Sequence, residues 1–244
     1  MPHRVFNIRE VAQYLHLAPE DVERLVKRGE VPCERQGERL VFRRQEIDAW
    51  ASQRIMSLSD DQLPGFHTKS TARRRAISDE EALIPCLLSK DRIAPALASR
   101  TRASVLRDMV ALANATGLPT DPTELLDAIE EREKLCSTAL PGGVALLHPR
   151  HHTPYLTDAS FIVIGRVVQP IHFGSMDGQP TDLFFLLCCQ DDHLHLHALA
   201  RLCTLYQKTR ILEELRTADG ATEMYHAITA AEAQILRGIC PPRP

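Results

Sequence analysis

The residue types best suited to chemistry lie in one stretch, residues 130–152. Here a charged segment runs into Ser137–Thr138 and a Gly142–Gly143 turn, and the apolar run Val144–Leu147 then delivers His148. We expect the imidazole of His148 to lie at the edge of a sheet, open to a reactant. Histidine can form covalent intermediates as a nucleophile, and its unperturbed pKa of about 6.5 leaves much of it neutral near pH 7. The alternative interpretation is that His148 only ends a strand.

The elements around this stretch predict a layered α/β domain that begins at Cys86. Apolar side chains at helical spacing predict helices, whereas short apolar runs bounded by turn residues predict strands. The predicted helices are Thr101–Ala115, Asp121–Lys134 and His193–Gln207, with further helices ending near Leu236, and the predicted strands are Val144–Leu147, Ala159–Val168 and Leu183–Cys189. Strands that alternate with helices favour a sheet that helices cover.

The first fifty residues predict two helices, a hairpin and a third helix. Asn7, with Glu10 three positions later, is a capping-box signature for a helix from Ile8 to about Leu15. A second helix, Glu20–Arg28, stops at Gly29, the residue type that most often ends a helix. The elements that follow are a hairpin over Val31–Arg43 with Gly37 at its tip and a helix that begins at Gln45.

This order of elements resembles the excisionase-type winged helix-turn-helix domain over residues 5–52. The matching segments are REVAQYLHL, VERLVKRGEVP and VFRRQEIDAW. The resemblance implies that the second helix enters the major groove of DNA and that the hairpin contacts the DNA backbone. Cations at these places supply the phosphate contacts that dominate affinity. The implied DNA-binding residues are Arg24, Lys27 and Arg28 on the second helix and Arg35 and Arg39 on the hairpin.

The charge of this domain leaves a second interpretation open, in which it docks a protein. Glu20, Asp21 and Glu23 cluster at the start of the second helix, where base-reading side chains usually lie, and carboxylates there repel phosphates. Residues 1–54 contain ten Lys and Arg against nine Asp and Glu, a net charge of +1. A second copy of the chain is a further candidate partner, because dimerisation would double the contacts with DNA.

The composition changes between residues 55 and 85. This stretch is polar, contains Pro64–Gly65 and a run of arginines at Arg73–Arg75, and has no sustained apolar period. We therefore predict a helix-turn-helix domain over residues 1–54, a linker over residues 55–85 and an α/β domain over residues 86–244.

Residues 86–236 resemble the enzyme IIA domain of the bacterial phosphotransferase system, of the fructose/mannitol and nitrogen-related type. Three blocks carry the resemblance in the family's order: REKLCSTALPGGVALLH, QPIHFGSMDGQPTDLFFLL and HLHALARLCTLYQKTRILEEL. The resemblance implies a mixed sheet flanked by helices. It also implies a phosphohistidine carrier that takes a phosphoryl group from a histidine-containing phosphocarrier protein, with no cofactor.

The same resemblance implies the residues of the site. His148 would be the phosphoryl acceptor, and His195 would donate to the phosphoryl group or orient His148. Arg132 would supply a fixed cation, and Ser137 or Thr138 a hydroxyl donor near the turn.

Two positions depart from the family pattern. The family commonly has proline before the histidine and a small residue after it, whereas this chain has Leu147 and Pro149. Proline lacks the backbone N–H that could serve a phosphoryl oxygen. The alternative function is therefore an unphosphorylated enzyme IIA-like module that regulates a kinase or a transporter by binding it.

A cluster of histidines near the second block also raises the question of a metal. On a helix His193 and His197 are neighbours, whereas His195 points elsewhere, and no glutamate follows in the HExxH order of zinc sites. We expect no metal site.

The bulk composition fits these predictions. The chain has 244 residues, of which 44% are hydrophobic and 25% charged, and its net charge of −3 gives no global cationic field. No apolar run approaches the roughly 18 residues of a membrane span, and the N-terminus lacks the apolar core of a signal peptide. Seven cysteines without a CxxC pair suit a reducing cytoplasm. We thus expect a cytoplasmic transcriptional regulator that responds to the phosphotransferase system through His148.

Overall fold

The computed structural model describes residues 5–15, 17–37, 39–57, 82–150 and 155–238. The chain divides into two compact units, Met1–Glu81 and Ala82–Pro244. Each unit has its own sheet.

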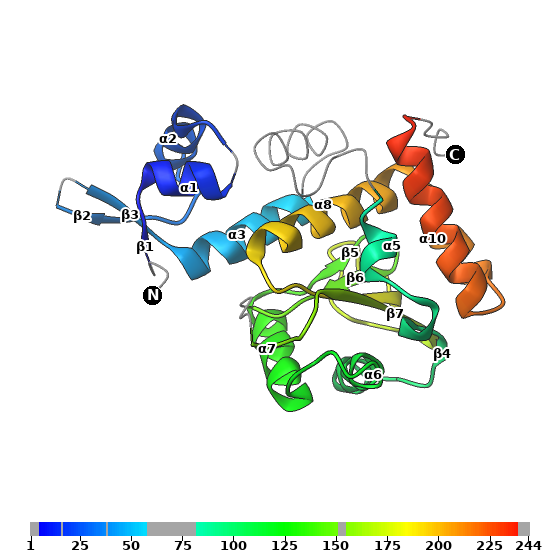
Figure 1. Cartoon of the computed structure of the whole chain (residues 1–244). Helices are drawn as coiled ribbons and strands as arrows, with labels where there is room; N and C mark the ends of the chain where they lie inside the picture. The colour runs from blue at the N-terminus through cyan, green and yellow to red at the C-terminus, as the bar shows by residue number, and fades with distance from the viewer. Residues whose placement is uncertain (1–4, 16, 38, 58–81, 151–154, 239–244) are drawn as a thin grey trace. The chain divides into compact units, whose positions relative to one another are not determined.

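In its described residues, the first unit has a small three-stranded sheet and three helices (Figure 1). Its antiparallel strands have the order β1-β3-β2. The elements are β1 (Val5–Phe6), α1 (Ile8–Tyr14), α2 (Pro19–Lys27), β2 (Glu34–Gln36), β3 (Arg39–Arg43) and α3 (Arg44–Ser57).

Local sequence signals explain most of this unit. Asn7 and Glu10 form the predicted capping box, with Glu10 N donating to Asn7 Oδ1 at 3.0 Å and Asn7 N donating to Glu10 Oε2 at 2.7 Å. Gly29 and Gly37 have φ values of +68° and +63°, so each provides the left-handed turn that the sequence predicts at these positions. The pairing of β1 with β3 was not predicted, because two residues carry no periodicity. Helix α3 begins at Arg44, one residue before the predicted start, and continues to Ser57.

The second unit contains a mixed five-stranded sheet of order β4-β7-β8-β6-β5. Strand β6 runs parallel to β8, β4 runs parallel to β7, and the other two pairs are antiparallel. The elements are α5 (Ile84–Leu87), η1 (Lys90–Arg92), β4 (Ile93–Leu97), α6 (Arg102–Asn114), α7 (Pro122–Leu135), β5 (Ala139–Leu140), β6 (Val144–Leu147), β7 (Phe161–Ile171), β8 (Thr181–Cys188), α8 (Asp192–Lys208), α9 (Ile211–Thr217) and α10 (Ala221–Leu236).

Helices α6 and α7 cover one face of this sheet (Figure 1). Side chains of both helices, among them Met109 and Ile129, share a buried cluster with Ala145 and Leu147 of β6. The absence of a side chain at Gly165 permits this packing, because a Cβ there would lie 2.5 Å from Met109 Sδ. Burial of each large apolar side chain in such a cluster contributes about 1.5–3 kcal/mol.

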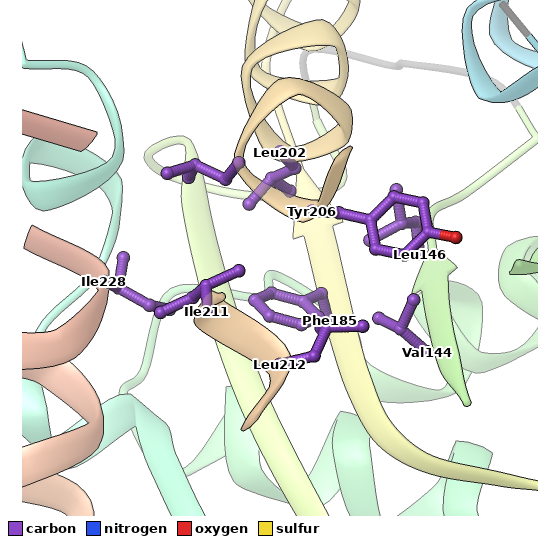
Figure 2. A pocket seen from close by; sticks show the side chains of 9 residues that line it. Val144, Leu146, Phe185, Leu202, Tyr206, Ile211, Leu212 and Ile228 are labelled. Carbon is purple, nitrogen blue, oxygen red and sulfur yellow. The ribbon is translucent and has the colours of Figure 1, made fainter. Parts of the chain in front are cut away.

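Helices α8, α9 and α10 border the opposite face, since successive residues of a strand point to opposite sides. An apolar pocket lies between these helices and the sheet, and Figure 2 shows Leu146 of β6 and Phe185 of β8 across from Leu202, Ile211 and Ile228. The strand that carries His148 is therefore held by apolar packing on both faces.

The start of the second unit is fixed by a buried ion pair. Glu232 of α10 accepts hydrogen bonds from the backbone N–H groups of Leu83 and Ile84 and pairs with Arg201 of α8 at 3.2 Å.

Helical structure extends into both ends of the stretch that we assigned to the linker, because α3 ends at Ser57 and α5 begins at Ile84. The remainder of that stretch, residues 58–81, lies outside the described residues. In the described part of the chain, no helix is long and apolar enough to cross a membrane.

Candidate functional site

His148 follows β6 directly, as the sequence predicts, but its side chain is not open to solvent. Its exposed fraction is 2%, so our expectation of an accessible imidazole is wrong for this conformation of the protein. The reason is that neighbouring side chains from two helices, Arg132 of α7 and His195 of α8, cover the end of the strand.

The hydrogen bonds of His148 define the protonation of its ring. The Nδ1 atom lies 2.8 Å from the carbonyl oxygen of Leu146, which can only accept, so Nδ1 carries a proton. The Nε2 atom accepts from Arg132 Nε at 3.1 Å, and an arginine N–H can only donate, so Nε2 holds a lone pair. Both partners together select the neutral imidazole with its nucleophilic lone pair on Nε2.

Helix α7 positions Arg132. The side chain of Asp121 caps its N-terminus by accepting from Thr123 N at 2.7 Å. Leu125, Ile129 and Arg132 recur at helical spacing on the buried face, so the guanidinium points inward and is 2% exposed.

Arg132 is held by the end of its own helix. Its Nη1 donates to the carbonyl oxygen of Cys136 at 3.1 Å and to Cys136 Sγ at 3.3 Å. Among the described residues its Nη2 has no hydrogen-bond acceptor, although the atom is buried. One guanidinium N–H pair is thus available to an oxygen that enters the site.

Helix α8 brings His195 beside His148. The Asp191 side chain caps this helix through Leu194 N at 2.9 Å, and His195 lies one turn before Leu199 on the buried face. The two imidazole rings are 5.0 Å apart between centroids and inclined by 46°. The structure therefore brings together the predicted histidines His148 and His195, and Arg132 lies beside them.

The two predicted hydroxyl donors have partners elsewhere. Ser137 Oγ donates to the carbonyl oxygen of Phe173 at 2.9 Å, and Thr138 Oγ1 donates to the carboxylate of Glu133. Thr138 N also donates to Glu133 Oε1 at 3.1 Å, so this carboxylate fixes the backbone next to β5. We did not predict a role for Glu133, although its position beside Arg132 on the same helix was a usable signal. Burial raises the pKa of Glu133, against the opposing effects of Thr138 and Arg102.

The Gly142–Gly143 turn before β6 is fixed from several sides. The carboxylate of Asp177 accepts from Gly142 N at 3.0 Å, and Arg216 Nη2 donates to the carbonyl oxygen of Gly142 at 2.6 Å. Hydrogen bonds from the Ser175 hydroxyl and then from the N–H of Gly142 lower the pKa of Asp177. Gly143 has φ +82°, and a Cβ there would lie 2.8 Å from Arg216 Nη2, so a larger residue would displace this clamp.

The predicted DNA-binding cations lie on the surface of the first unit. Lys27, Arg35 and Arg39 are exposed, and no ion pair involves them in the ranges that the structure describes. Arg24 pairs with Asp21, and Arg28 pairs with Glu30 at 3.4 Å, so acidic neighbours partly neutralise the helix α2 cations.

The second unit, a mixed sheet with a buried arginine and two adjacent histidines at the end of β6, is an enzyme IIA-type domain, and a helix-turn-helix domain precedes it. The family model described as "Phosphoenolpyruvate-dependent sugar phosphotransferase system, EIIA 2" matches residues 86–231, and the model described as "Helix-turn-helix domain" matches residues 5–55. The chain belongs to the EIIA type 2 family of the phosphotransferase system. These matches confirm the enzyme IIA resemblance and the presence of an N-terminal helix-turn-helix domain, whereas its excisionase type stays a prediction.

Individual relatives agree with this membership. A nitrogen regulatory protein of Bradyrhizobium diazoefficiens is 34% identical over 150 residues, which cover 60% of this chain and 95% of the relative. The nitrogen regulatory protein of Escherichia coli is 33% identical over 123 residues, covering 48% of this chain and 72% of the relative. The crystal structure of the nitrogen regulatory protein IIA-Ntr from Neisseria meningitidis superposes with a TM-score of 0.54 at 25% identity, over 60% of this chain and 99% of that one.

Proposed function

We propose that the enzyme IIA-type domain accepts a phosphoryl group on Nε2 of His148 from a histidine-containing phosphocarrier protein. The protonation of His148 carries this proposal, because its hydrogen bonds to Leu146 and Arg132 leave a neutral ring with a lone pair on Nε2. In the proposed transfer, Nε2 forms a bond to phosphorus while the bond from phosphorus to the donor nitrogen breaks. The proton on Nδ1 stays in place, so no additional base is required.

Arg132 has to move during this reaction. Its Nε occupies the Nε2 lone pair at 3.1 Å, so attack on phosphorus requires this hydrogen bond to break. A phosphoryl oxygen would then accept from the guanidinium, which also has Nη2 available. His195, with its ring 5.0 Å from that of His148, would donate to the phosphoryl group or hold His148 in orientation. Ser137 and Thr138 would contribute only after leaving their present partners.

The test is to incubate the protein with phosphoenolpyruvate, enzyme I and the histidine-containing phosphocarrier protein and to measure its mass. We expect one phosphoryl group per chain, acid-labile and base-stable as a phosphoramidate. The substitution His148→Ala should abolish labelling. The substitution His195→Ala keeps the nucleophile and should slow transfer about 10²–10³-fold, the usual effect of losing one such donor. A His148→Ala variant that still accepts the phosphoryl group would refute the assignment.

Two observations favour a second candidate function, an enzyme IIA-like module that regulates a kinase or a transporter without being phosphorylated. The acceptor imidazole is 2% exposed, and the residue that follows His148 is Pro149, which has no backbone N–H. The labelling experiment separates the two functions, provided that the same phosphocarrier phosphorylates a known enzyme IIA in parallel.

For the first unit we propose DNA binding, so that the whole chain is a cytoplasmic transcriptional regulator, with a homodimer as its DNA-bound form. The helix-turn-helix match and the exposed cations of α2 and of the β2–β3 hairpin support this role. Related proteins bear the description "Nitrogen regulatory protein", which supports a regulatory role and not a role as a sugar-transport component.

DNA binding can be tested through its salt dependence. Each phosphate contact contributes about 0.9 to the slope of log K against log salt, so Arg35→Ala with Arg39→Ala should lower the slope by about two units. The matched control is Arg9→Ala, an exposed arginine on α1, which should leave the slope unchanged. Absence of binding by the unsubstituted protein to both a random and a selected duplex at low salt would favour protein docking.

A further inference from the structure

Cys136 lies against the arginine of the site but has no part in the proposed transfer. It directly follows α7 and is half-buried. Its Sγ accepts from Arg132 Nη1 at 3.3 Å, and the Nε of the same guanidinium donates to His148 Nε2 at 3.1 Å. A change at this sulfur therefore reaches the acceptor nitrogen through one rigid planar group.

The other cysteines that the structure describes in the second unit differ in access or in charge. Cys189 is buried, and burial raises the pKa of its thiol. Cys188 and Cys203 are fully buried, and burial raises the pKa of each thiol to about 12, which keeps them protonated. Cys86 is exposed, but its Sγ donates to the carbonyl oxygen of Ala82 at 3.3 Å, a negative partner. Reactive cysteines are typically partly exposed in an electropositive environment, and Cys136 combines both properties.

The neighbourhood of Cys136 also contains a donor without an acceptor. Arg132 is 2% exposed, and its Nη2 has no hydrogen-bond partner among the described residues. An oxygen atom added to Sγ would bring an acceptor to this guanidinium. The transferring phosphoryl oxygens would need the same donor.

We propose that Cys136 is an oxidation site for peroxides, and that the sulfur-bound oxygen competes with the phosphoryl group for Arg132. In this step the sulfur lone pair attacks one oxygen of the peroxide and the O–O bond breaks. The sulfur is oxidised by two electrons to sulfenic acid, and the second oxygen leaves as hydroxide, or as an alkoxide from an alkyl peroxide. The leaving group takes the thiol proton and forms water or the alcohol. The consequence for phosphoryl transfer rests on the proposed function of His148, whereas the oxidation itself does not.

The experiment treats the full-length protein with hydrogen peroxide, traps sulfenic acid with dimedone and locates the adduct by peptide mass spectrometry. We expect the adduct on Cys136. In parallel, the rate of phosphorylation is measured before oxidation, after it and after reduction with dithiothreitol. The oxidised protein should be at least about tenfold slower, up to the 10²–10³-fold typical for loss of one donor, and reduction should restore it. The ratio of reduced to oxidised rates should fall to one in Cys136→Ala and persist in the control Cys86→Ala.

A third measurement keeps the two proposals distinguishable. The ¹⁵N chemical shifts of the His148 imidazole report the hydrogen bond from Arg132 without any phosphoryl donor. Oxidation should shift the Nε2 signal in the unsubstituted protein but not in Cys136→Ala. Absence of an adduct on Cys136 would overturn the inference. An adduct that leaves the Nε2 signal unchanged would also overturn it, provided that the rate of phosphorylation, where phosphorylation occurs, is unchanged as well. If the reduced protein accepts no phosphoryl group but oxidation shifts its Nε2 signal, the phosphoryl carrier function is refuted and the oxidation site is supported.

Discussion

Replacement of Arg132 by lysine tests whether the guanidinium geometry, and not only its charge, is required at the site. Arginine makes three hydrogen bonds here, at 3.1 Å to His148 Nε2, at 3.1 Å to Cys136 O and at 3.3 Å to Cys136 Sγ. A lysine ammonium is a compact point donor on a flexible stem and cannot reproduce this planar fork. His148 would keep its bond to the Leu146 carbonyl and hence its nucleophilic Nε2.

The magnitude follows from the bonds that are lost. A missing donor to the transferring group typically costs about 2.7–4 kcal/mol in the transition state, so we expect phosphorylation of Arg132→Lys to be about 10²–10³-fold slower. The Cys136 carbonyl oxygen would also lose its partner. An unsatisfied buried polar group costs about 1–3 kcal/mol, and we expect the free energy of unfolding to decrease by an amount in that range.

The assay is the single-turnover rate of transfer from the phosphorylated carrier protein, with thermal unfolding measured on the same samples. The matched control is Arg102→Lys, a half-exposed arginine on α6 that contacts Glu133 at 3.3 Å. Exposed ion pairs contribute about 0–1 kcal/mol, so this control should stay within about twofold of the original rate. A folded Arg132→Lys protein that transfers at the original rate would refute the reasoning, as would an equal loss in the control.

Three further predictions concern the backbone after His148, the buried carboxylate and the domains. Pro149→Ala restores a backbone N–H, and one neutral hydrogen bond contributes about 0.5–1.5 kcal/mol, so phosphorylation should become about two- to tenfold faster; an unchanged rate would exclude this position from the phosphoryl contacts. Because burial raises the pKa of Glu133, the folded state binds its proton more tightly than the unfolded state. Unfolding curves between about pH 7 and pH 4 should therefore show the original protein gaining stability relative to Glu133→Gln as the pH falls, and a constant difference would contradict that pKa. Residues 82–244 alone should unfold cooperatively within a few degrees of the corresponding transition of the whole chain, and loss of that transition would contradict independent domains.

The sequence predicts the elements of the site better than their contacts. Strand β6 begins and ends as predicted, and the Asp121 cap and the apolar spacing of α7 place Arg132 on its inward face. The short strands β4 and β5 were not predicted, because their stability comes from pairing with β7 and β6 and not from any period of their own.

The burial of His148 and the partners of the two hydroxyls depend on contacts that sequence spacing does not encode. Ser137 bonds to a carbonyl 36 residues away, and His148 is covered by a helix that begins more than forty residues later. A histidine after an apolar strand is compatible with an exposed or a buried ring, and only the packing of α7 and α8 decides between them.

The packing of α7 and α8 also determines how phosphorylation of His148 could change the structure around the site. Arg132 comes from α7, which packs on the face of the sheet that contains Ala145 and Leu147. His195 comes from α8, which packs on the opposite face with Leu146. His148 thus lies where the two helical layers meet at the end of one strand. A phosphoryl group on Nε2 would add about −1.5 to −2 charges between them and displace the Arg132 hydrogen bond, so we expect phosphorylation to shift α7 relative to α8. Hydrogen exchange in the last turn of α7 and the first turn of α8 should increase on phosphorylation, and unchanged protection of both turns would show that the charge is accommodated locally.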